Sequence, residues 1–71
     1  MKPLPFREVK RKLEASGLVE AGQTGSHMKF AKTTADGTRT ATVPKHHDVA
    51  AGTLRSIIRQ AGLSTQEFDA L

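Results

Sequence analysis

The clearest chemical signal in this sequence is one histidine, His27, in the stretch Gly25-Ser26-His27-Met28. An imidazole ordinarily has a pKa of about 6.5, so it can serve as a general base or a general acid near neutral pH. Lys29 follows closely, and a lysine ammonium can hold a phosphate and stabilise developing negative charge. Cleavage of RNA by its own 2′-hydroxyl needs a base, donors for the charged phosphorane and an acid for the leaving oxygen. The two residues are of types that can support RNA cleavage without a metal.

Two simpler interpretations of His27 stay open. A solitary histidine in an unfamiliar protein is often only a polar surface residue. Residues 25–28 also match the remnant that a protease-cleavable expression tag leaves behind. Such a remnant ordinarily lies at a terminus, whereas 24 residues precede this one and its apolar Met28 alternates in step with Phe30. The alternation favours a native segment of the fold.

A second group of potential ligands, His46, His47 and Asp48, raises the possibility of a metal site. Zinc sites need three or four converging ligands, and adjacent residues rarely point the same way. A loop that caps the second helix is the preferred interpretation of this triplet. We therefore expect neither a metal nor another cofactor.

The first element that should support the site is a helix spanning residues 5–16. Its apolar residues fall on one helical stripe, namely Phe6, Val9 and Leu13. Gly17 suits the left-handed position that follows a helix. Glu8 and Lys12 are spaced for an ion pair across one helical turn.

After Gly17 the apolar residues alternate, which predicts an antiparallel meander of strands at residues 18–21, 27–32 and 38–43. The turns between these strands are predicted at residues 22–25 and 35–37. In the second strand Met28 and Phe30 should face a covering layer, which places His27 and Lys29 on the open side of the sheet.

The C-terminal part predicts a second helix ending at Gly62, followed by a short third one. The second helix has a buried stripe of Leu54, Ile57, Ile58 and Ala61. Ser64 and Glu67 have the spacing of a capping box, and Phe68 and Leu71 are expected to pack back on the body. The expected fold is α+β, an α-β-β-β-α arrangement in one domain of residues 1–71, with both main helices on one face of a three-stranded antiparallel sheet.

Composition points to a polyanionic partner. Eleven Lys and Arg against seven Asp and Glu give a net charge of +4. There is no Trp or Tyr, so contacts to phosphate and sugar should dominate over base stacking. The candidate RNA contacts are Lys29, Lys45, Arg55 and Ser26, and Arg59 shares the helix face of Arg55. The absence of Cys and of a long apolar segment favours the cytoplasm, with no membrane involvement.

Two longer motifs carry a resemblance to a known family. One is Gly25-Ser26-His27 followed by Phe30, and the other is Thr42-Val43-Pro44 followed, after a loop, by Gly52-Thr53-Leu54-Arg55-Ser56-Ile57. Together with the order of elements, they resemble the HicA family of bacterial and archaeal toxins over nearly the whole chain. Leu18 departs from the pattern, because relatives often have a larger aromatic residue there, and we expect this to affect packing more than chemistry.

The resemblance implies a small ribonuclease that cleaves messenger RNA, with a fold similar to a double-stranded-RNA-binding domain. It assigns the catalytic role to His27 and implies a HicB antitoxin as partner, which we expect to cover the face that bears His27 and Lys29. Two alternatives stay open: a non-catalytic RNA-binding module on the same fold, and an adaptor whose basic face binds an acidic protein.

Overall fold

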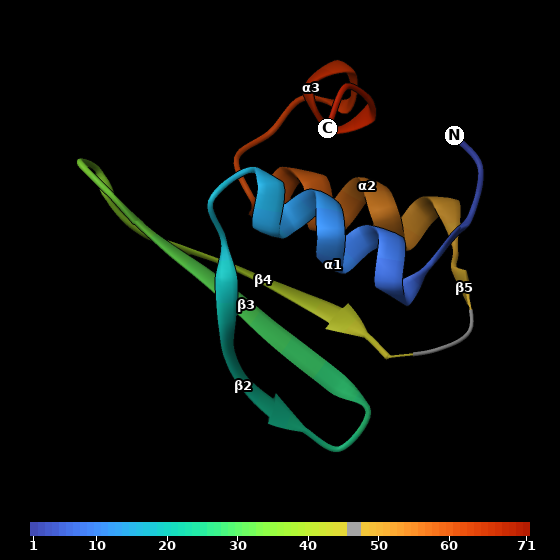
Figure 1. The fold of residues 1–71 in the computed structure, drawn as a ribbon, viewed down its shortest axis with the longest axis horizontal. Coiled ribbons are helices and arrows are strands. Elements are labelled where there is room, and N and C mark those ends of the chain that lie inside the picture. Colours follow the sequence, from blue (N-terminus) through green and yellow to red (C-terminus); the bar gives the residue numbers. More distant parts are fainter. Residues whose placement is uncertain (46–47) are drawn as a thin grey trace.

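The computed structural model describes residues 1–45 and 48–71. Its elements are, in order, β1 (Leu4–Pro5), α1 (Phe6–Ala15), β2 (Val19–Thr24), β3 (His27–Thr34), β4 (Gly37–Pro44), β5 (Asp48–Val49), α2 (Ala51–Gln60) and α3 (Thr65–Asp69). Strands β2, β3 and β4 form an antiparallel sheet in that order. The expected α+β fold, with its helix, three-stranded meander and second helix, is confirmed (Figure 1).

The two faces of this sheet differ because apolar and polar residues alternate along its strands. Met28 and Phe30 of β3 and Ala41 and Val43 of β4 are buried beneath the helices. These four residues belong to one hydrophobic core, which the helices, β5 and the residue before β2 complete. The other core residues are Val9, Leu13, Leu18, Val49, Leu54, Ile57, Ile58, Ala61 and Phe68. The opposite face, called the open face from here on, carries the alternate residues of each strand, which are mostly exposed.

Both main helices run in the same direction over the sheet, from the side of β1 and β5 toward the side where the β3–β4 hairpin projects (Figure 1). Two cations of that hairpin meet the C-terminal ends of the helices. Lys32 donates from Nζ to the Ser16 carbonyl at 2.9 Å, and Arg39 lies against Gly62. Positive charge is favourable at a helix C-terminus. The Lys32 hydrogen bond therefore anchors the hairpin to the end of α1, whereas Arg39 stays exposed beside Gly62, just beyond the end of α2.

Strand β2 is longer than the sequence suggests. The prediction ended this strand at Ala21 and treated residues 22–25 as a turn, but the strand continues to Thr24. Gly22 pairs with Lys29 next to an irregularity in the register, with φ of +148°. A glycine inside a strand often marks a bulge, and here that bulge was mistaken for a turn.

Two short segments pair in a way that the sequence does not reveal. Strand β1 pairs antiparallel with β5, with Leu4 opposite Val49 and Pro5 opposite Asp48. Strand β1 leads directly into α1, and one residue separates β5 from α2. Asp48 is therefore part of a strand, and the predicted cap for the second helix is wrong at this residue. The N-cap of α2 is Ala50, which makes no side-chain capping bond. His46 and His47, the other members of that predicted cap, lie outside the described residues.

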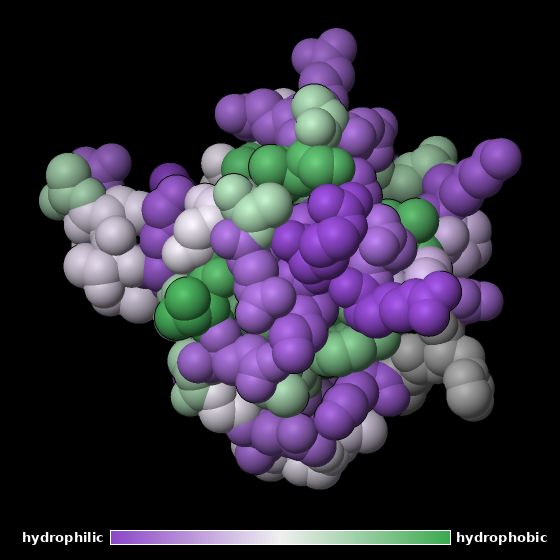
Figure 2. Space-filling model, in the orientation of Figure 1, coloured by the Kyte–Doolittle hydropathy of each residue, from purple (hydrophilic) through white to green (hydrophobic). Residues whose placement is uncertain are grey.

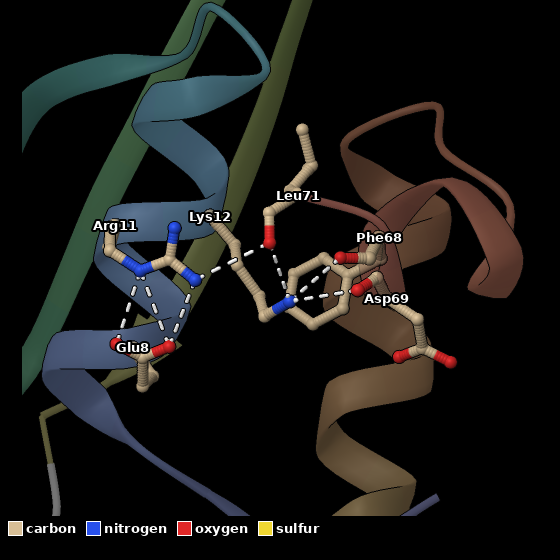
Figure 3. A network of polar contacts seen from close by, with 6 residues as sticks. All are labelled: Glu8, Arg11, Lys12, Phe68, Asp69 and Leu71. Atoms are coloured by element: carbon tan, nitrogen blue, oxygen red, sulfur yellow. Dashed lines mark hydrogen bonds and ion pairs between the residues drawn. The ribbon is translucent and has the colours of Figure 1, made fainter.

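Lys12 does not form the predicted ion pair with Glu8. Glu8 is bound by Arg11, whose hydrogen bond holds the pKa of this carboxyl below its usual value. Lys12 is buried, and its Nζ donates to the carbonyl oxygens of Phe68, Asp69 and Leu71 at 3.0, 3.4 and 3.1 Å (Figure 3). The ammonium also lies 5.2 Å from the centre of the Phe68 ring. This residue thus fastens α3 to α1.

The short α3 has its own stabilising contacts. Ser64 and Glu67 form the predicted capping box, and the hydrogen bond from the Ser64 backbone lowers the pKa of Glu67. Phe68 is fully buried and Leu71 is packed against the core, as the sequence predicted. The segment is therefore ordered by a cap, by an aromatic anchor and by Lys12 together.

We expect Lys12→Ala to lower the free energy of unfolding by about 1–3 kcal/mol, because the carbonyls at the end of α3 lose their charged donor. The measurement is urea unfolding followed by circular dichroism. Lys10→Ala is the matched control, since Lys10 lies on the same helix with its ammonium at the surface, paired with Glu20. A smaller loss is expected there, and equal losses for the two variants would contradict the role given to Lys12.

Hydrophilic residues dominate the surface seen in Figure 2, and the apolar residues form only small patches between them. Among exposed large apolar residues in the described part of the chain, Val19 stands out because 61% of its surface is accessible. None of the helices described is long and apolar enough to span a bilayer.

Candidate active site

A tight turn sets His27 at the start of β3. Thr24 and His27 pair across the two-residue loop Gly25-Ser26, and Gly25 has φ of +58°, which suits a glycine at the first central position of a hairpin turn. The Gln23 amide donates to the Gly25 carbonyl at 3.0 Å. The Lys45 backbone N–H donates to the Ser26 carbonyl at 2.6 Å, so the end of β4 braces the same turn.

The side chain of His27 is directed to the open face because its neighbours along the strand are directed inward. Met28 is 7% exposed and Phe30 is fully buried, so the pleat leaves His27 and Lys29 together on the other side. Both residues are exposed. This confirms the predicted placement of the two side chains on the open face.

His27 and Lys29 share a shallow hollow of about 280 Å³. It is lined by Ala21, Gly22, Gln23, Thr24, His27, Lys29 and Thr42. We call it the His27 hollow. Its lining contains an imidazole, an ammonium, an amide and two hydroxyl groups, and no carboxylate. Such a set can bind an anion and transfer a proton, and the imidazole makes no side-chain hydrogen bond to the residues described.

The structure brings some of the predicted site residues together and separates one of them. Ser26 and Lys45 are exposed and lie next to His27, joined by the backbone hydrogen bond at the turn. Arg55 lies elsewhere. It lines a different hollow, of about 300 Å³, with Arg59 and residues of the α2–α3 connection.

Sequence reasoning missed five residues of the His27 hollow, namely Ala21, Gly22, Gln23, Thr24 and Thr42. Thr24 and Gly22 were assigned to a turn, although they pair with His27 and Lys29. Thr42 had a usable signal, since it alternates with the buried Ala41 and Val43 and so belongs to the polar face.

No group of three or more His, Cys, Asp or Glu side chains within residues 1–45 and 48–71 is arranged to hold a metal ion. The alternative metal site raised in the sequence analysis depends on His46 and His47, which lie outside the described residues. The hollow that the structure does describe has donors for an anion and none of the carboxylates that hard cations prefer.

Comparison with known proteins supplies one match. The model of a protein family described as the HicA toxin of bacterial toxin-antitoxin systems matches residues 6–63. The matched range contains every residue of the His27 hollow and ends just before α3. A search of curated proteins finds no significant match.

Proposed function

The chain belongs to the HicA family of toxins from bacterial toxin-antitoxin systems, and from that premise we propose that it is a ribonuclease that cleaves messenger RNA at the His27 hollow. Cleaving messenger RNA would inhibit translation, which gives the toxin its effect. A cytoplasmic location follows from this proposal, because messenger RNA is translated there.

The observation that carries the proposal is the pairing of His27 with Lys29 in one exposed, carboxylate-free hollow. A proton-transferring group and a cation within one small hollow supply two of the functions needed to cleave a phosphodiester without a metal, namely the base and the stabilisation of the phosphorane charge. No described residue covers the hollow, so within residues 1–45 and 48–71 nothing has to move for an RNA strand to reach it.

In the proposed reaction, the 2′-hydroxyl of the RNA attacks the adjacent phosphorus. His27 takes the proton of that hydroxyl, and Lys29 stabilises the negative charge on the phosphorane oxygens. The bond from phosphorus to the 5′-oxygen then breaks, that oxygen receives a proton from water, and the resulting hydroxide removes the proton from His27, which restores the imidazole. The products are a 2′,3′-cyclic phosphate and a 5′-hydroxyl end, so atoms and charges balance without an oxidant or another co-reactant.

Recognition should depend on phosphate and sugar more than on the bases. Of the three Phe residues, Phe30 and Phe68 are fully buried and Phe6 belongs to α1, so no Phe ring lies on the described open face. The stacking platforms of Phe, Tyr or Trp that many single-strand binders use are therefore missing from the described part of this face, so contacts to phosphate and sugar should dominate. Ser26 and Lys45, next to His27, are positioned to contact the flanking backbone.

Cleavage of a labelled RNA should continue in excess chelator at the rate seen without it, because none of the proposed steps uses a metal. The assay compares product formation by the purified protein with and without chelator, and a metal-dependent nuclease in the same buffer confirms that the chelator works. Activity that disappears and returns on addition of one divalent metal would contradict the mechanism and would direct attention to His46 and His47.

A further inference from the structure

We propose that Thr42 is a second phosphate-binding residue of the His27 hollow, and that its hydroxyl donates to the same RNA phosphate that Lys29 binds. The identity of the ligand rests on the proposed function. The placement of Thr42 rests on the fold alone.

Thr42 lies directly across the sheet from Lys29. The two residues are partners in the register of β3 and β4, and both line the hollow. Side chains directly opposite each other in an antiparallel pair have Cβ atoms about 4.5–5.5 Å apart. A phosphate oxygen held by the Lys29 ammonium is therefore within reach of a hydroxyl on Thr42.

Two buried neighbours and one hydrogen bond fix the position of Thr42. Its neighbours Ala41 and Val43 are fully buried, which directs its own side chain to the open face. Its backbone N–H donates to Oε1 of Gln60 at 3.0 Å, so helix α2 holds β4 at this residue, on the outer edge of the sheet. The hydroxyl itself makes no hydrogen bond within the described residues, and it is exposed. The backbone is thus held in place, and among the described residues nothing occupies the hydroxyl that would bind the ligand.

The third residue in this row of the sheet leaves room for the ligand. Gly22 pairs with Lys29 from the other side, and a Cβ added to it would have no neighbour within 4 Å. Across the three strands, Gly22 therefore leaves open space, Lys29 supplies a cation and Thr42 supplies a hydroxyl. A volume of about 280 Å³ lies just below the roughly 300–1,000 Å³ of pockets for drug-sized ligands, so the space suits one nucleotide unit.

The same strand provides a matched control. Thr40 lies on the open face, two residues from Thr42, but it pairs with Ala31 and does not line the hollow. Replacing either threonine by valine removes one hydroxyl and keeps the β-branched shape that suits a strand. Thr42→Ser keeps the hydroxyl and removes only the methyl group.

The experiment measures binding of a single-stranded DNA oligonucleotide, which carries phosphates but lacks the 2′-hydroxyl, across a series of salt concentrations. We expect Thr42→Val to weaken binding about 10-fold, as for the loss of one hydrogen bond to a charged group, with an unchanged salt slope. Lys29→Met should instead reduce the salt slope by about 0.7, the value for one phosphate contact on a single strand. The kcat/KM for RNA should fall with Thr42→Val by the same factor as the affinity.

Thr42→Ser and Thr40→Val should both bind within about twofold of the parent, which is the range of neutral surface substitutions. The assignment of Thr42 is overturned if Thr42→Val binds the oligonucleotide as well as the parent does. It is also overturned if Thr40→Val or Thr42→Ser loses as much affinity as Thr42→Val. Because the DNA measurement needs no cleavage, it tests Thr42 even if the protein proves not to be a ribonuclease. Conversely, normal RNA cleavage together with unaffected binding by Thr42→Val would reject Thr42 and leave the proposed function in place.

Discussion

Replacing His27 by Ala is expected to lower the rate of RNA cleavage by at least about 100-fold and to abolish growth inhibition, since positioned general acid–base catalysis contributes about 10²- to 10⁴-fold. The fold should persist. His27 is exposed, and the turn that presents it is held by Gly25, Gln23 and the Lys45 backbone, none of which depends on the imidazole. The measurements are cleavage of a labelled RNA and thermal unfolding of the same preparation.

Two comparisons make this result specific. Lys10→Ala, on the helix side, is expected to cleave at the parent rate, because Lys10 pairs with Glu20 away from the hollow. DNA of the same sequence should be inert, because it lacks the 2′-hydroxyl that acts as the nucleophile. If His27→Ala cleaves at even about a third of the parent rate with the same products, His27 is neither the acid nor the base.

The same variant separates the three functional classes. A non-catalytic RNA-binding module would keep its function after His27→Ala. An adaptor for an acidic protein would show no salt-dependent affinity for RNA, whereas a ribonuclease with phosphate contacts loses affinity as salt rises. The ribonuclease proposal therefore requires both a loss of cleavage in the variant and a salt-dependent affinity in the parent.

Addition of the cognate antitoxin is expected to stop cleavage completely, through direct competition with RNA for the open face. HicA toxins belong to toxin-antitoxin systems, so a cognate antitoxin is implied. The catalytic residue proposed here lies in an exposed hollow, and the described residues include no segment that covers it. We therefore propose that the partner covers His27 and Lys29, and that its interface is acidic to match a toxin of charge +4.

Charge reversal tests where the antitoxin binds. Lys29→Glu should slow association of the antitoxin by about 10-fold or more at low salt, as expected when a steering charge at the interface is reversed. Arg59→Glu makes the same change in net charge on α2, beside the separate hollow, and should have a smaller effect. An antitoxin and an RNA that bind together without weakening each other would contradict occlusion, as would a complex that leaves His27 open to solvent.

Alternation and helical spacing were sufficient to predict the parts of the fold that depend on local pattern. Met28 and Phe30 are apolar and face the core. Because side chains alternate between the two faces of a strand, His27 and Lys29 must then face outward. The capping box at Ser64 is equally local. These features need no knowledge of which segments meet in space.

The parts that escaped prediction depend on contacts between distant segments. Lys12 binds the carbonyl of Phe68, which is 56 positions away in the sequence. A helical pattern alone predicts that such a lysine lies at the surface, so its burial could not be foreseen. Strands β1 and β5 span two residues each, too few to show a period. Arg55 was correctly placed on a helix. The sequence pattern does not tell whether that side of the helix lies near the open face of the sheet, and the structure places this arginine at another hollow.

The two-residue turn at Gly25 and Ser26 makes the site sensitive to insertions and deletions. Side chains along a strand alternate between faces, so shifting the pairing of β3 by one residue would send His27 toward the helices and Met28 toward solvent. Relatives that diverge in sequence should therefore keep the length of this turn even where its residues change. The distal tip of the β3–β4 hairpin projects beyond the helices (Figure 1) and holds no residue of the hollow, so variation in loop length can accumulate there without moving the histidine.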